Sequence, residues 1–237
     1  MEYRCDATSV TGFVQQLAVA YVGHGYFFYV TGEIPERKDP RAVDSRIIEK
    51  YGIAIGKTAR ARRKAAGFAN LQYLRFRRRF VLLATRGQHR FFEEEGKFIR
   101  DLREVPIKFA GYAVSYRSGH PHVRIEQRQY LELKAFLSDL AVHRPQEWFE
   151  EEFRRLPFEP YAPIRSQLFG ILREVNRRRM LARFEPIPSS ALRMRRKIVT
   201  PFGEKVAGKV NIASGNVTDF AVAPDDEGLA VLAAFNH

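Results

Sequence analysis

The chain has 237 residues, of which 45% are hydrophobic and 13% aromatic, and this composition excludes a protein that is disordered throughout. It carries 40 Lys and Arg against 27 Asp and Glu, a formal charge of +13, and such a surplus usually persists because a polyanion neutralises it. The single cysteine, Cys5, excludes an internal disulfide. Neither a signal-peptide pattern nor an unbroken apolar run of ~20 residues occurs, so we expect a cytoplasmic protein without a membrane partner.

The first part of the chain predicts helices interspersed with strands. Asp39 and Pro40 are typical of a helix start, because the carboxylate caps free amides and proline lacks an N–H that the first turn does not need. Gly52 and Gly67 are placed to end two helices. The periodicity predicts helices over 11–22, 40–51, 57–66 and 88–102, a strand over 26–30, and two strands joined by an arginine-rich turn within 70–85.

The second part predicts a hairpin followed by helices. Ser118 and Gly119 are a good turn pair between strands over 107–116 and 121–126. Helices are expected from 128, over 148–156 and from 163. Because hairpins dominate the strand connections, we expect an α+β fold with a mainly antiparallel sheet and packed helices. The predicted parts are a core over 1–145, a basic helical extension over 146–200 and a weakly structured tail over 201–237.

The segment from Gly56 to Phe80 contains nine basic residues and no acid. Arginine dominates it, and the planar guanidinium suits phosphate and guanine better than an ammonium does. Phe68, Tyr73 and Phe76 lie between the cations and could stack on unpaired bases, or could face the core while the cations form a solvated surface. The predicted nucleic-acid contacts are Lys57, Arg60, Arg62, Arg63, Lys64, Arg75, Arg77, Arg78 and Arg79, together with Arg124, Arg177, Arg178 and Arg179.

His120, Pro121 and His122 form a short motif in the predicted hairpin. Residues two apart in a strand point to the same face, so both imidazoles can reach one divalent ion. Glu126 or His89 could supply a third ligand. Histidine suits Mn, Zn, Ni or Co, and a mixed histidine and carboxylate set with open positions suits a metal that polarises a phosphate. The alternative is a polar strand edge with two exposed histidines.

The segment from Arg117 to Ile125 resembles the metal-binding strand of HUH-superfamily endonucleases, which include rolling-circle replication initiators, relaxases and single-strand transposases. The resemblance implies a divalent metal, Mn or Mg or else Zn, held by His120, His122 and Glu126. It also implies a tyrosine that attacks the scissile phosphate and forms a 5′-phosphotyrosine. Tyr161 and Tyr130 are the candidates, with Tyr161 slightly favoured by its distance from the histidines along the chain. Proline departs from the family pattern, since it fits best on an edge strand.

Two functions follow from these observations. The first is a nucleic-acid-processing protein of mobile-element or replicon type, a metal-dependent single-strand endonuclease or transposase. The second is a non-catalytic RNA- or DNA-binding subunit of a larger nucleoprotein complex, without a cofactor. The expected partners are single-stranded or hairpin DNA or structured RNA, with other proteins in such a complex. A metal-dependent hydrolase of small molecules would fit the histidines but would leave the charge unexplained.

Overall fold

The computed structural model describes residues 3–203. They form an α+β fold with antiparallel sheets, as predicted, and divide into two compact units. Unit 1 contains the described residues up to Pro106, the hairpin tip Tyr116–Pro121 and the described residues from Val199. Unit 2 contains Ile107–Ser115 and His122–Ile198.

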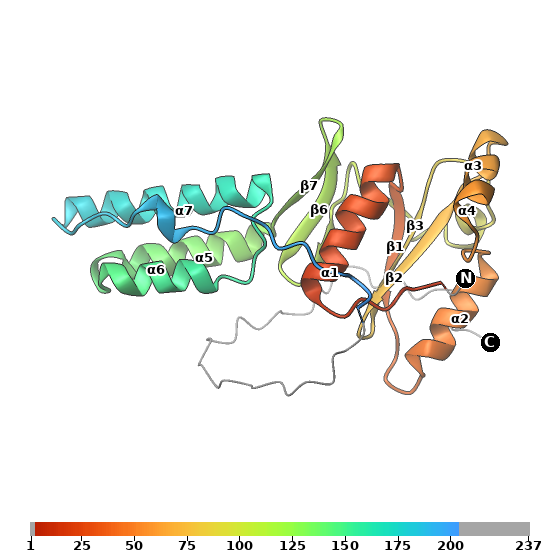
Figure 1. The fold of residues 1–237 in the computed structure, drawn as a ribbon, viewed down its shortest axis with the longest axis horizontal. Helices are drawn as coiled ribbons and strands as arrows, with labels where there is room; N and C mark the ends of the chain where they lie inside the picture. The colour runs from red at the N-terminus through yellow and green to blue at the C-terminus, as the bar shows by residue number, and fades with distance from the viewer. Residues whose placement is uncertain (1–2, 204–237) are drawn as a thin grey trace. The chain divides into compact units, whose positions relative to one another are not determined.

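Unit 1 is built on a four-stranded antiparallel sheet in the order β2-β3-β1-β4. Figure 1 shows α1 on one side of this sheet and α2 on the other. Alternate strand residues therefore face two helical layers; Val30, Tyr73 and Leu82 pack with Ile47 of α2 in one core cluster. The elements are α1 Val10–Gln15, a π-helical continuation Gln16–Tyr21, a 3₁₀ turn Val22–His24, β1 Phe28–Glu33, α2 Pro40–Lys50, α3 Lys57–Ala65, β2 Leu71–Phe76, β3 Arg79–Ala84, α4 Phe91–Glu94 and β4 Arg100–Asp101.

Local sequence signals set several of these boundaries. The Asp39 carboxylate accepts hydrogen bonds from the amides of Arg41 at 3.2 Å and Ala42 at 3.3 Å, and Pro40 opens the helix. Gly52 has a φ of +57°, which a glycine adopts without strain. The predicted capping of α2 is therefore confirmed.

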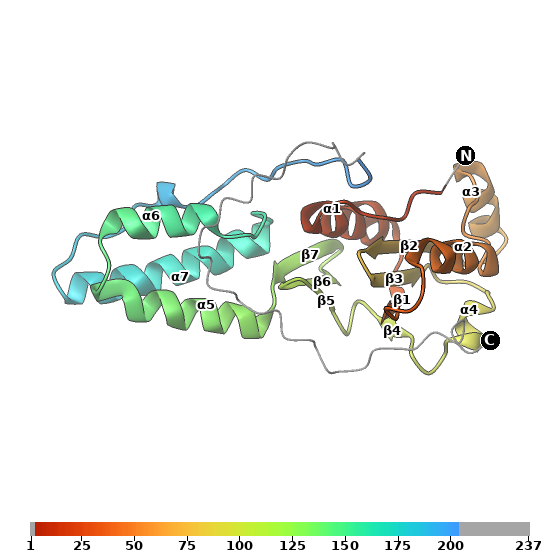
Figure 2. The same ribbon diagram turned by 90° about the horizontal axis from the view of Figure 1, so that it is seen from below.

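Unit 2 combines a three-stranded sheet, in the order β5-β6-β7, with a group of helices. Figure 2 shows α5, α6 and α7 alongside one another. Phe149, Phe153, Ile171 and Val175 are at most 1% exposed and form the core of these helices. The elements are β5 Ile107–Phe109, β6 Tyr112–Arg117, β7 His120–Ile125, α5 Gln127–Asp139, a 3₁₀ turn Leu140–Val142, α6 Gln146–Arg155, α7 Ala162–Leu181 and a 3₁₀ turn Ser189–Ala191.

Two predicted elements are wrong. The segment 88–102 is not one helix: α4 has only four residues, and Arg100–Asp101 pairs with β1 as β4. The segment 107–116 is not one strand, because Ala110 and Gly111, both with positive φ, turn the chain between β5 and β6. No helix among the described residues is long and apolar enough to cross a membrane. Of the predicted tail, residues 204–237 lie outside the described residues.

Candidate nucleic-acid interface

The basic residues of the segment 56–80 lie at two opposite ends of the unit 1 sheet. At one end, Ala84 of β3 is paired with Phe28 of β1 and Leu71 of β2. We call it the cleft end, after the cavity described below. At the other, the turn end, Arg79 is paired with Glu33 and Phe76. Five residue steps separate the ends, about 17 Å at ~3.3 Å per residue. The basic segment 56–80 therefore contributes cations to two separate surfaces, one at each end of the sheet.

At the turn end, Arg75 is an internal structural residue. Its side chain is 5% exposed, its Nε lies 2.9 Å from Oδ1 of Asp44, and its Nη2 lies 3.1 Å from Oδ2 of Asp6. Asp44 also accepts the hydroxyl hydrogen of Tyr73 at 2.8 Å. Arg75 was predicted to contact nucleic acid, and this is corrected, because the buried Asp44 carboxylate needs the guanidinium as its counter-charge.

The other arginines of the turn end are also occupied in part. Arg78 donates to four backbone carbonyl oxygens of residues 34–38, at 2.7–3.2 Å, and so fixes that loop. Nε of Arg79 lies 3.7 Å from a carboxylate oxygen of Glu33. Arg77 is exposed and has a φ of +56° in the tight turn.

At the cleft end, an open cavity of about 520 Å³ collects basic and aromatic side chains. Its lining contains the three cations Lys64, Arg86 and Arg103 and the two rings of Phe27 and Phe28, and it contains no acid. His24, Gly25 and Thr85 complete the lining. We call this cavity the cleft. Its volume falls within the ~300–1,000 Å³ typical of small-ligand sites.

Helix α3 brings Lys64 to the cleft while burying none of its own residues. Two of its arginines attach it to the body of unit 1. Arg60 donates to the carbonyl oxygen of Ile53 at 3.2 Å and Arg63 to that of Ala69 at 3.2 Å. The exposed cations Lys57, Arg62 and Lys64 of this helix remain in solvent.

The loop after β3 places Arg86. Thr85 accepts a hydrogen bond from the amide of Asn70 at 2.9 Å, and residues 85–88 lie directly against the backbone of residues 67–69. Gly87 permits this contact, since it has a φ of +141° and a Cβ there would lie 2.5 Å from the amide nitrogen of Ala69. Arg86 is thus held by backbone contacts while its own side chain is exposed.

Arg103 is held differently from the other two cations. Its Nε lies 2.9 and 3.1 Å from the two carboxylate oxygens of Asp101, and these hydrogen bonds lower the pKa of that carboxyl. Its guanidinium carbon lies 5.2 Å from the ring centroid of Phe27 and 5.7 Å from that of Phe28. The ring of Tyr116 supports Phe27 at a centroid distance of 4.5 Å. The Arg103 guanidinium is therefore held by Asp101 and lies close to two aromatic rings.

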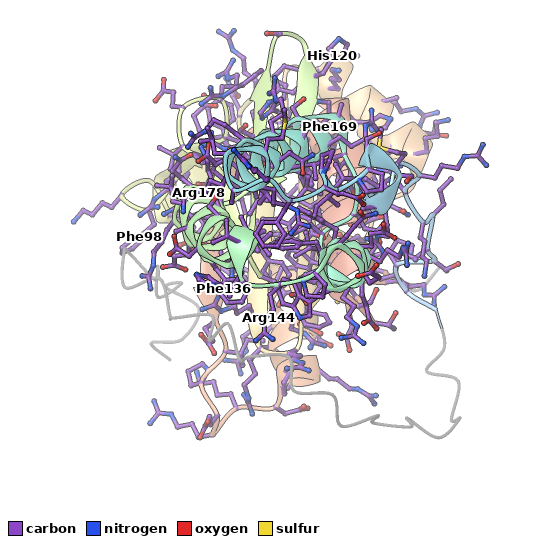
Figure 3. The ribbon with its side chains drawn as sticks, turned by 90° about the vertical axis from the view of Figure 1, so that its left-hand side faces the viewer. Phe98, His120, Phe136, Arg144, Phe169 and Arg178 are labelled. Atoms are coloured by element: carbon purple, nitrogen blue, oxygen red, sulfur yellow. The ribbon has the colours of Figure 1, made fainter. Side chains whose placement is uncertain are left out.

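The predicted histidine motif lies on β7. Val123 and Ile125 are buried, whereas His120 is exposed and His122 half-buried, which confirms the predicted alternation. β7 is at the edge of its sheet, where Pro121 can be tolerated. Figure 3 shows His120 where β7 begins, next to the turn that joins it to β6.

The acid and histidine expected to complete a metal site have other partners. One carboxylate oxygen of Glu126 accepts the amides of Arg128 at 2.9 Å and Gln129 at 3.3 Å, which caps α5, and the other lies 3.7 Å from Nζ of Lys108. Nδ1 of His89 accepts the amide of Phe91 at 3.1 Å. In residues 3–203 no group of three or more His, Cys, Asp or Glu side chains could hold a metal. The predicted metal site stays a prediction.

The two candidate nucleophiles both belong to unit 2. Tyr161 precedes α7, its hydroxyl is buried, and burial raises its pKa although the nearby Arg196 opposes this. The guanidinium carbon of Arg196 lies 4.7 Å from its ring centroid. Tyr130, on α5, packs its hydroxyl against Gly170 of α7, where a Cβ would lie only 3.2 Å from the oxygen.

The predicted basic residues of unit 2 have mostly protein partners. Arg179 is 2% exposed and donates to the carbonyl oxygens of Ala141, Arg144 and Glu185, so its predicted role in nucleic-acid contact is corrected. Arg177 and Arg178 form ion pairs with Glu174 at 2.7 and 3.2 Å. Arg124 is half-buried on β7.

No protein-family model matches this chain, and no curated protein sequence matches it. Of the cleft residues, only Lys64 was predicted as a site residue. Phe27 and Phe28 were predicted only as part of the strand over 26–30, and Arg103 was assigned no role. The position of Thr85 and Arg86 directly after a strongly apolar strand was the available signal, because strand ends face loops and solvent.

Proposed function

We propose that this protein binds nucleic acid through the cleft end of unit 1. The observation that carries the proposal is the convergence of Lys64, Arg86 and Arg103 on a cavity whose lining includes two phenylalanines and no acid. Cations bind the phosphate backbone and aromatic faces accept bases, and the combination is typical of single-strand binding surfaces.

Helix α3 extends this surface beyond the cleft. Lys57 and Arg62 are exposed on the same helix as Lys64, and none of the three forms an ion pair within residues 3–203. A backbone longer than the cleft could therefore follow the helix. The overall charge of +13 favours association with a polyanion at long range.

The cleavage chemistry implied by the family resemblance stays a prediction. The tyrosine oxygen would attack phosphorus, the P–O3′ bond would break, and the tyrosine proton would leave with a base or the departing 3′-oxygen. The buried Tyr161 hydroxyl and the capping role of Glu126 supply no support for this step. Binding is thus the function that the site supports best.

The test is the salt dependence of binding. Fluorescence anisotropy with a labelled 20-nucleotide single strand should show an affinity that falls steeply between 50 and 200 mM salt, since bound cations displace condensed counterions. The double variant Lys64→Ala/Arg86→Ala should bind more weakly, with the slope reduced by about 0.7 per lost phosphate contact. Arg46→Ala, an exposed α2 residue that does not line the cleft, is the matched control. An affinity independent of salt would contradict the proposal.

A further inference from the structure

The three cations of the cleft are not equivalent. Lys64 and Arg86 are exposed and form no ion pair within the described part of the chain, so their charges are available to a ligand. Arg103 directs its Nε and Nη2 donors at Asp101 and forms an ion pair with this carboxylate. Donors that already form hydrogen bonds with a carboxylate cannot at the same time form a bidentate contact with a phosphate. With two of its three guanidinium nitrogens engaged, Arg103 is less suited to a phosphate contact than Lys64 and Arg86.

The guanidinium group of Arg103 has a flat face on which another planar group can stack. Asp101 fixes the plane of the guanidinium, the rings of Phe27 and Phe28 lie near it, and 49% of its side-chain surface remains exposed. Guanidinium planes and aromatic rings are the groups on which proteins stack unpaired bases. The guanidinium plane favours a base over an aliphatic group, because a cationic group interacts with the electron-rich face of a π-system.

From these contacts we propose that the cleft holds one unpaired nucleotide of the bound strand. Its base stacks on the platform made of Arg103, Phe27 and Phe28, and its phosphates face Lys64 and Arg86. The inference rests on the proposed function and adds a preference for unpaired over paired nucleic acid. In a duplex both faces of a base are covered by its neighbours, so a paired base cannot reach the platform without leaving the stack.

Support for the platform comes from its attachment to the sheet. Asp101 belongs to β4 and is paired with Phe28 of β1, so the carboxylate and one ring of the platform share a strand pair. Asp101 also accepts the backbone amide of Arg103 at 2.9 Å, which fixes the turn between them. A preformed platform loses little conformational entropy when a base stacks on it.

The experiment compares one 20-nucleotide single strand with its duplex, each as DNA and as RNA, by fluorescence anisotropy at constant salt. A 2-aminopurine in the single strand reports stacking directly. The wild-type protein should prefer the single strand and change the 2-aminopurine signal. Arg103→Lys keeps the charge but loses the plane, so single-strand affinity should fall about tenfold, which is typical of one lost stacking contact, while duplex affinity stays constant. Phe27→Leu, which removes the ring beneath the guanidinium, should act in the same direction.

Lys64→Ala/Arg86→Ala is the matched control, because it should weaken single strand and duplex alike and leave their ratio unchanged. Equal binding of both forms, with no effect of Arg103→Lys or Phe27→Leu on their ratio, would overturn the nucleotide platform and leave the proposed function intact. Failure of every oligonucleotide to bind would contradict the proposed function itself. Tight binding of free AMP without oligonucleotide binding would overturn both, since it would make the cleft a small-molecule site.

Discussion

Both ends of the unit 1 sheet carry basic side chains, and the two ends use them in different ways. At the turn end, Arg75 neutralises a buried carboxylate, Arg78 fixes a loop through backbone carbonyls, and Arg79 lies near Glu33. At the cleft end, backbone contacts position Arg86, and Lys64 and Arg86 face solvent. A basic run in the sequence therefore leaves cations available to a ligand only where the fold gives them no internal partner.

The largest effect is expected from Arg75→Met. The substitution leaves the Asp44 carboxylate buried without its counter-charge, which costs about 3–5 kcal/mol in the free energy of unfolding. Urea denaturation measures this loss. Arg77→Met, at the exposed residue of the same end, should stay within about 0.5 kcal/mol of wild type. Equal stability of the two variants would remove the distinction between internal and available arginines at the turn end.

Gly87→Ala should destabilise the cleft end. The added methyl group would lie 2.5 Å from a backbone nitrogen, at a φ of +141°. A forced conformation of this kind costs about 1–3 kcal/mol, and thermal denaturation should show a lower Tm. Gly119→Ala is the matched control, because Gly119 also has a positive φ but a Cβ there meets no atom within 4 Å. If the two variants lost equal stability, the close approach of the loop at Gly87 would not be what positions Arg86.

The smallest effect is expected from the tyrosines. Tyr161→Phe and Tyr130→Phe should bind a single strand with wild-type affinity, because neither residue lines the cleft. Incubation of the wild-type protein with single-stranded DNA and Mn²⁺, followed by a denaturing gel, tests separately for a covalent adduct. An adduct that disappears in His122→Ala and in one Phe variant would instead support the endonuclease suggested by the family resemblance.

Local signals in the sequence predicted much of the fold. The Asp39–Pro40 start of α2, the end of α3 before Gly67 and the turn at Ser118–Gly119 each depend on a few neighbouring residues. The region 88–102 could not be predicted in this way. Its two-residue strand β4 forms because β1 provides an edge to pair with, and that edge lies about seventy residues earlier in the chain.

The candidate site was predicted only in part for the same reason. Lys64 was identified from the basic run, but Arg86 and Arg103 reach the cleft because β1 pairs with both β3 and β4. The burial of Arg75 depends on Asp44 and Asp6, which are distant in the sequence. Pairing partners far apart along the chain therefore decided which arginines remained available.

The most direct test of the account compares two double variants that each remove two positive charges from unit 1. Lys64→Ala/Arg86→Ala changes the cleft end, and Arg78→Ala/Arg79→Ala changes the turn end, where both side chains have internal partners. The measurement is the slope of log affinity against log salt for a single-stranded oligonucleotide. We predict that the cleft variant lowers the slope by roughly 1.4, as expected for two lost phosphate contacts on a single strand, and that the turn variant leaves it close to wild type. A turn variant that lowers the slope as much as the cleft variant would contradict the account.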